Sequence, residues 1–207
     1  MNTFTITGNL FIITAASGAG KTSLVKELLA RDTQVQLSIS HTTRAPRAGE
    51  IDGVHYHFVS QTEFSQILDA GGFLESATVH GSQYGTSQIS LDAALQAGYD
   101  VILEIDWQGA AQVRNIYAQS IGIFILPPSI DALSARLNAR NLDSIEVIDR
   151  RLSAAREEMR HVVEFDYVTI NDDFDLALQD LMAIIRTHRL KTGIQMQRYA
   201  TLVQALI

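Results

Sequence analysis

Four short apolar runs along the chain have the length and composition of buried β-strands. They cover residues 10–13, 101–105, 121–126 and 167–170, and each is followed by a polar, glycine-rich or proline-containing turn. Apolar runs of about four to eight residues between turn signals are typical of strands that are covered on both faces. The pattern therefore predicts four parallel strands buried in the middle of the molecule.

Helical periodicity fills much of the chain between and after these runs. Apolar residues recur at helical spacing from Leu24 to Leu29, again over 130–139, and again over 174–190. Strands that alternate with amphipathic helices are typical of a parallel sheet with helices on both faces. We therefore expect a doubly wound α/β core.

Two segments depart from this alternation. Residues 40–90 contain short alternating pieces such as 55–59 together with six glycines, which predicts a small inserted β-rich subdomain. The segment 136–160 has a mostly helical pattern with many arginines, and it predicts a mobile lid that carries positive charge. The arginines of this segment are Arg136, Arg140, Arg150, Arg151, Arg156 and Arg160.

Composition narrows the classes of protein that need to be considered. The 207 residues are 46% hydrophobic and 19% charged, which is typical of a globular protein and not of a disordered one. Sixteen basic against 23 acidic residues give a net charge of −7, which argues against non-specific binding to nucleic acid or to anionic membranes. The absence of cysteine excludes disulfides, thiolate metal sites and cysteine nucleophiles. Because no basic residue precedes Lys21 and no apolar run approaches the length of a membrane span, we expect a cytoplasmic protein.

A glycine-rich turn between the first apolar run and the first helix carries the clearest chemical signal. Its end, Gly20-Lys21-Thr22, matches the pattern G-x-x-x-x-G-K-[ST], although Ala15 stands where the pattern begins with glycine. In such a P-loop, backbone N–H groups hold phosphate oxygens, the lysine reaches the β- and γ-phosphates, and the hydroxyl binds magnesium. The residues expected to surround a nucleotide triphosphate are Ala15, Ala16, Ser17, Gly18, Ala19, Gly20, Lys21, Thr22 and Ser23.

Two other interpretations of this turn are open. A glycine-rich turn that caps an ordinary helix is the simpler one, but the strand before it and the helix after it are the context of a P-loop. A dinucleotide-binding turn of the form G-x-G-x-x-G fits less well, because Ser23 stands where the third glycine belongs. The turn therefore predicts phosphate binding without naming an acceptor.

Five sequence blocks together resemble the guanylate kinase family. They lie at 17–23, 40–50, 84–86, 105–109 and 171–173, in the family's order and roughly at its spacing, so the resemblance covers about residues 8–190. The most specific block runs from Thr42 through Arg44 and Pro46 to Arg47. The resemblance implies transfer of the γ-phosphoryl group of ATP to GMP, giving ADP and GDP, with Mg²⁺, in guanine nucleotide synthesis and salvage.

The same resemblance implies an architecture. We expect an α/β fold with a P-loop NTPase-type parallel sheet flanked by helices, an inserted β-rich GMP-binding subdomain and a helical lid. The implied divisions are a core at about 8–39, 91–135 and 161–190, a GMP-binding subdomain at about 40–90, a lid at about 136–160, and a C-terminal helical extension at 191–207. Apolar residues near the end of that extension, such as Leu202 and Leu206, predict either core packing or a subunit contact in a possible homo-oligomer.

By similarity to the family, two groups of residues would recognise GMP. Glu75 and Asp106 would accept hydrogen bonds from the guanine N1–H and N2–H groups. A carboxylate attracts guanine at that edge and repels adenine, which presents a lone pair there. The residues expected to hold the GMP phosphate are Arg44, Arg47, Tyr56 and Tyr84, and those expected near guanine O6 are Ser40 and Thr86. Without the family, these would be ordinary loop, core and surface residues.

The resemblance also implies roles on the ATP side. Arg136, Arg140 and Arg151 match arginines that would reach the transferred phosphoryl group, although Asn141 stands where the family usually has glycine. Asn171 would lie near the ATP ribose or adenine, with a helix N-cap as the simpler alternative. Glu104 stands where the resemblance leads us to expect aspartate, and it would orient magnesium-bound water near Thr22 or orient the P-loop lysine.

Three alternatives remain at this point. His55 and His57 would share one face of a strand and could bind a metal, but exposed strand positions are the simpler explanation. Domains that resemble guanylate kinases but are catalytically silent bind phosphoproteins, usually with a degraded P-loop and with neighbouring domains. The third alternative is a kinase of another small phosphorylated acceptor. Glu75, Thr86 and Asp106 argue against it because they favour a guanine.

Overall fold

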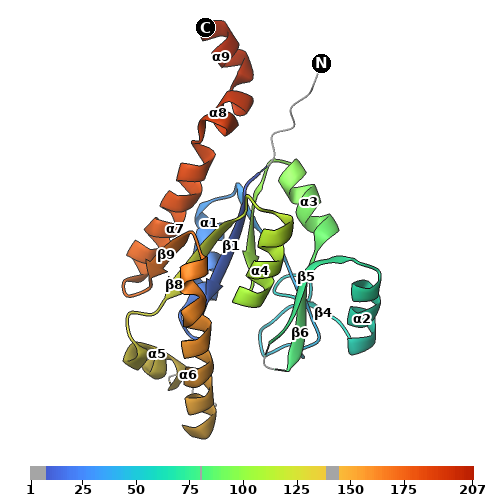
Figure 1. Cartoon of the computed structure of the whole chain (residues 1–207), viewed down its shortest axis with the longest axis vertical. Coiled ribbons are helices and arrows are strands. Elements are labelled where there is room, and N and C mark those ends of the chain that lie inside the picture. Colours follow the sequence, from blue (N-terminus) through green and yellow to red (C-terminus); the bar gives the residue numbers. More distant parts are fainter. Residues whose placement is uncertain (1–7, 80, 139–144) are drawn as a thin grey trace.

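The computed structural model describes residues 8–79, 81–138 and 145–207 (Figure 1). Its larger sheet has five parallel strands in the order β2-β7-β1-β8-β9. The four strands predicted from apolar runs are all present, and the parallel α/β class is confirmed. The strands are β1 (Leu10–Ala15), β2 (Val35–Leu37), β7 (Asp100–Glu104), β8 (Ile121–Leu126) and β9 (Tyr167–Ile170).

The central strand β1 is covered on both faces because its side chains alternate. Phe11 and Ile13 belong to a buried cluster with α1 and α7, whereas Leu10 and Ile12 belong to a second cluster with α3 and α4. This arrangement explains why the strand is a continuous apolar run instead of an alternating one. The four covering helices are α1 (Lys21–Arg31), α3 (Gln88–Gln96), α4 (Trp107–Ile116) and α7 (Phe174–Arg189).

A second, four-stranded sheet lies beside the core, in the order β4-β3-β6-β5 (Figure 1). It occupies part of the segment 40–90, where an inserted subdomain was predicted. Its helix begins with a capping box in which the Ser60 side chain accepts from the Glu63 N–H and the Glu63 carboxylate accepts from the Ser60 N–H. The elements are β3 (His41–Thr42), β4 (His57–Phe58), α2 (Gln61–Asp69), β5 (Phe73–Val79) and β6 (Ser82–Ser87).

Two helices follow β8 in the segment predicted to form the lid. They are α5 (Ile130–Asn138) and α6 (Ile145–Arg160), and a 3₁₀ turn, η1 (His161–Glu164), leads from α6 to β9. Leu133 and Leu137 of α5 pack with Ala155 of α6 and with Ala16 of the P-loop. Part of the predicted lid therefore contacts the phosphate-binding turn directly.

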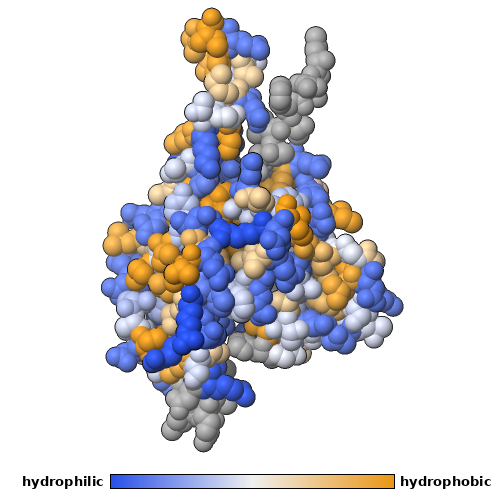
Figure 2. All heavy atoms as spheres, viewed as in Figure 1, coloured by the Kyte–Doolittle hydropathy of each residue, from blue (hydrophilic) through white to orange (hydrophobic). Residues whose placement is uncertain are grey.

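The C-terminal segment continues the line of α7 away from the body of the molecule (Figure 1). It forms α8 (Thr192–Arg198) and α9 (Ala200–Leu206), with a break at Tyr199. Leu202 is 55% exposed and Leu206 73% exposed, so these side chains do not pack into the core of this chain. Figure 2 shows apolar side chains gathered on one side of this tip.

A buried ion-pair network fixes the end of α7 to the sheet. The Arg189 Nε donates to an Asp100 oxygen at 2.5 Å, and Nη1 donates to Asp32 at 2.7 Å. The other Asp100 oxygen accepts from the Asn9 backbone and side chain. Buried charges of this kind are tolerated only when they are paired, so the network ties α7 to the start of β7 and the end of α1.

Across residues 8–79, 81–138 and 145–207, no helix combines the length and the apolar character needed to cross a membrane.

Candidate active site

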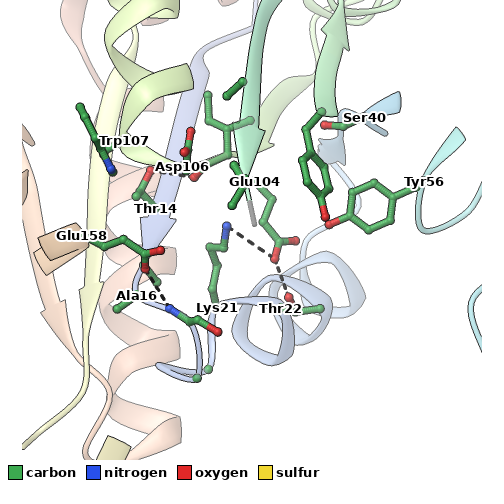
Figure 3. Close-up of a pocket in the computed structure, with 18 of the residues that line it drawn as sticks. Thr14, Ala16, Lys21, Thr22, Ser40, Tyr56, Glu104, Asp106, Trp107 and Glu158 are labelled. Atoms are coloured by element: carbon green, nitrogen blue, oxygen red, sulfur yellow. Dashed lines mark hydrogen bonds and ion pairs between the residues drawn. The ribbon is translucent and has the colours of Figure 1, made fainter. Parts of the chain in front are cut away.

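A pocket lies at the carboxyl ends of β1 and β7 and is also lined by the smaller sheet (Figure 3). Open α/β sheets commonly bind ligands at this end of their strands. Most of the residues singled out from the sequence meet here. Those that line the pocket are Ala15, Ala16, Ser17, Gly18, Gly20, Lys21, Thr22, Ser23, Ser40, Arg47, Tyr56, Glu75, Tyr84 and Asp106, together with Glu104.

The P-loop is held from behind by Asn171, which follows β9. The buried Asn171 side chain donates through Nδ2 to the Ala19 carbonyl oxygen at 2.7 Å. Gly20 has a φ of +99°, and a Cβ there would lie 2.2 Å from that Nδ2 atom, so glycine is required. Gly20 is also the N-cap of α1 and has no side chain, which leaves the N–H groups of the first turn to an anionic ligand.

Glu104 joins the P-loop to the end of β7. The parallel register places Glu104 beside Ile13 of β1. The Thr22 hydroxyl donates to the Glu104 carboxylate at 2.6 Å, and the Lys21 Nζ lies 4.0 Å from the same oxygen. Glu104 thus contacts both P-loop residues that carry the phosphate chemistry. The adjacent hydroxyl and carboxylate are hard oxygen donors, the type of ligand that Mg²⁺ prefers.

Glu75 is a buried carboxylate in the wall of the pocket. It pairs with Thr86 in the β5–β6 register, is 4% exposed, and accepts a 2.6 Å hydrogen bond from the Thr86 hydroxyl. Burial raises the pKa of Glu75 to about 7; the Thr86 hydrogen bond opposes this rise, and the nearby Asp106 charge adds to it. A ligand that donates N–H groups to this carboxylate would favour its ionised form.

Asp106 is the N-cap of α4 and also faces the pocket. One of its oxygens accepts from the Gly109 N–H at 2.9 Å, and the other accepts from the Gln108 side chain at 3.0 Å. A Cβ on Gly109 would lie 2.6 Å from a Glu75 carboxylate oxygen. Gly109 therefore fixes Asp106 and leaves room for Glu75.

An arginine and two tyrosines in and next to the smaller sheet lie close together. Arg44 forms a 2.8 Å ion pair with Glu50, and its guanidinium carbon lies 5.5 Å from the centre of the Tyr56 ring. The Tyr56 and Tyr84 rings meet edge to face at 5.8 Å. Burial, together with the Glu104 charge, raises the pKa of Tyr56 to about 12, so its hydroxyl stays protonated and can donate to an anion. Arg47 lines the pocket itself.

The predicted lid arginines have different positions. Arg136 donates to the Asn171 carbonyl oxygen at 2.8 Å and lies behind the P-loop, whereas Arg151 donates to the Ser17 hydroxyl at 3.1 Å. Arg140 and Asn141 lie outside the described residues. The described site residues beyond the pocket lining are Ala19, Arg44, Thr86, Arg136, Arg151 and Asn171.

The two histidines proposed as metal ligands have other partners. His55 lies in a turn, where its Nδ1 accepts from the Ile51 N–H, and His57 packs against the His41 ring. Within the part of the chain that the structure describes, no three His, Cys, Asp or Glu side chains come together in a way that could hold a metal ion. The alternating pattern at 55–59 placed His55 on a strand, but the backbone turns there.

Sequence reasoning missed four residues of the site. Glu50 and Gly109 lie in sequence blocks that resemble the family, but nothing in the sequence was a reason to assign them a role. The Arg44–Glu50 ion pair and the close approach of Gly109 to Glu75 exist only in the folded chain. Trp107 and Glu158 also line the pocket. Glu158 follows Arg151 by seven positions, about two helical turns, and this spacing could have placed both residues on one face.

The pocket combines a P-loop at the carboxyl end of a five-stranded parallel sheet with a wall from the smaller sheet and its loops that carries Arg47 and the buried Glu75. These features define a P-loop nucleotide-binding protein of the phosphotransferase type. The family model described as "Guanylate kinase" matches residues 7–188. The chain belongs to the guanylate kinase family.

Relatives support this assignment over nearly the full length. The chain is 66% identical over 200 residues to a guanylate kinase of Methylobacillus flagellatus, covering 97% of this chain and 99% of the relative. It is 55% identical to a guanylate kinase of Dechloromonas aromatica with the same coverage. The crystal structure of guanylate kinase from Anaplasma phagocytophilum superposes with a TM-score of 0.76 at 30% identity, covering 90% of this chain and 88% of that chain.

The raised pKa of Glu75 predicts a pH-dependent stability difference. Because the folded protein binds the Glu75 proton more tightly than the unfolded chain does, stability is lost as pH rises from about 4.5 to above 7. Glu75→Gln removes this pH-dependent loss of stability. The difference in the free energy of unfolding, variant minus wild type, should therefore be about 1–3 kcal/mol larger at pH 8 than at pH 5. Urea unfolding at both pH values measures the difference, and a difference independent of pH would contradict the assignment.

Proposed function

We propose that the chain transfers the γ-phosphoryl group of ATP to GMP, giving ADP and GDP, with the residue roles described below. This is the reaction of the family to which the chain belongs. The acceptor oxygen is already anionic, so the protein has to align two polyanions and offset their charge, and it needs no nucleophile of its own. The observation that carries the proposal is one pocket lined by both the P-loop and the buried Glu75.

The donor side of the pocket holds the phosphates of ATP. The P-loop N–H groups bind phosphate oxygens, and Lys21 reaches the phosphate that is transferred. The Lys21 ammonium group lies 4.0 Å from a Glu104 oxygen, and both residues line the pocket. When bound, Mg²⁺ would be held by Thr22, with Glu104 beside it, and would offset phosphate charge.

The acceptor side holds the phosphate of GMP through Arg44, Arg47, Tyr56 and Tyr84. The Arg44 guanidinium, by hydrogen bonding, lowers the pKa of the Glu50 carboxyl, so Glu50 stays ionised and fixes the arginine before any ligand arrives. A preformed guanidinium fork and phenol hydroxyl groups suit a phosphate dianion. Fixing them in advance reduces the entropy lost on binding.

Recognition of the base rests on Glu75 and Asp106. Both accept hydrogen bonds, and guanine offers N1–H and N2–H donors at the edge that they would face, with Ser40 and Thr86 near O6. Adenine would place a lone pair against the Glu75 and Asp106 carboxylates and would offer them no further donor. The preference for GMP over AMP in kcat/KM should therefore be on the order of 10⁴.

The lid roles remain predictions. Arg136, Arg140 and Arg151 would offset charge on the transferred phosphoryl group, and Asn171 would contact the ATP ribose or adenine as well as supporting the P-loop.

A cytoplasmic location, a possible homo-oligomer and the division into core, GMP-binding subdomain and lid are also proposed. An intact Lys21 and Thr22 in contact with Glu104 argue against a catalytically silent binding module.

An assay of ADP formation with ATP and Mg²⁺ tests the proposal, with GMP, dGMP, AMP, CMP and UMP as separate acceptors. GMP should be used far better than AMP, and Lys21→Ala should reduce turnover with GMP by at least about 10³. Lys26→Ala, which removes an exposed lysine from the same helix, is the matched control and should keep full activity. Folded wild-type protein that turns over none of the five acceptors would refute the proposed function.

The close approach of Gly109 to Glu75 gives a second prediction. In Gly109→Ala the new methyl group collides with the Glu75 carboxylate, so the KM for GMP should rise by about 10–100-fold while the KM for ATP is unchanged. Gly193→Ala is the control, because a Cβ there has no neighbour within 4 Å. Steady-state kinetics with each substrate varied in turn measures the effect. An unchanged KM for GMP would show that Glu75 does not position the acceptor.

A further inference from the structure

One face of α6 rests on the P-loop. The Glu158 carboxylate accepts a 3.1 Å hydrogen bond from the Ser17 backbone N–H, and Figure 3 shows this carboxylate reaching the turn. Two helical turns earlier, the Arg151 guanidinium donates to the Ser17 hydroxyl at 3.1 Å. The backbone and the side chain of one P-loop residue are thus both bound by the same helix.

Packing sets the position of this carboxylate. Ala155 lies between Arg151 and Glu158 on α6 and is fully buried against Ala16 and Leu137. Leu152 and Met159 extend the same apolar contact. Because buried side chains hold the helix against the turn, Glu158 reaches Ser17 through a defined contact and not as a freely moving surface side chain.

The chemistry of the Ser17 N–H explains why this contact matters. P-loop N–H groups point toward the place where phosphate oxygens bind, and Ser17 lies within that turn and lines the pocket. A carboxylate oxygen and a phosphate oxygen are both anionic acceptors, so each would use the same donor. Two negative groups in one small pocket also repel each other.

We propose that the Glu158 carboxylate competes with a phosphate oxygen of ATP for the Ser17 N–H and is displaced when the phosphate chain binds. The inference rests on the proposed function, because it assigns the P-loop to ATP. Glu158 is then a positioning residue that holds α6 on the P-loop and lowers the affinity for triphosphate. Displacement of Glu158 leaves Arg151, on the same face, beside the incoming phosphates.

Binding of magnesium tripolyphosphate to the full-length wild type and to Glu158→Gln, followed by calorimetry, tests the proposal. Replacing the carboxylate by an amide turns a charge-assisted hydrogen bond into a neutral one of the same shape, so tripolyphosphate should bind about five- to tenfold more tightly. The control is Glu157→Gln, which removes the same charge from the neighbouring exposed residue and should leave the affinity unchanged.

The kinetic readout separates this role from a structural one. In Glu158→Gln the KM for ATP should fall by the same factor while the KM for GMP stays constant, whereas general loosening of the fold would change both. Tripolyphosphate affinity in Glu158→Gln that equals or falls below the wild-type value would overturn the inference. If the wild type binds tripolyphosphate but does not phosphorylate GMP, the proposed function fails while the Glu158 comparison still decides this inference.

Discussion

The burial of the Glu75 carboxylate is the constraint around which the acceptor side of the molecule is arranged. The β5–β6 register places Thr86 opposite Glu75, and its hydroxyl provides a 2.6 Å hydrogen bond within the protein. The missing side chain of Gly109 leaves space for the second oxygen, and the Gly109 N–H fixes Asp106 nearby. A buried carboxylate with so few donors destabilises the fold at neutral pH, and in the proposed complex guanine would supply the missing donors.

The donor side depends on the parallel pairing of β1 with β7. That register brings Glu104 beside the strand that leads into the P-loop, and the Thr14 hydroxyl donates to the Ile105 carbonyl oxygen where the two strands end. The carboxyl ends of two strands thus place Lys21, Thr22 and Glu104 in contact, while the turn after β7 carries Asp106 to the acceptor side. One pair of strands would therefore set the relative position of the two proposed substrate sites.

The core could be predicted from the sequence because its strands are covered on both faces and read as continuous apolar runs. The strand β2 was missed because Val35–Leu37 is short and has a polar residue at its centre. The P-loop is local in sequence and was found from its motif, whereas Glu75 and Asp106 were assigned only through the family resemblance. The contacts of Glu50, Gly109 and Glu158 depend on tertiary packing, which no single segment of sequence records.

In the proposed complex, an ionised Glu75 in a buried site recognises the acceptor base. Calorimetric titration of GMP at pH 7, in buffers with different heats of ionisation, measures the number of protons released on binding. Glu75 has a pKa of about 7, so about half of the Glu75 carboxyls carry a proton at pH 7 and lose it when they bind the base. The GMP phosphate contributes equally to both proteins. The wild type should therefore release about half a proton more than Glu75→Gln. Equal proton release by the two proteins would contradict the account.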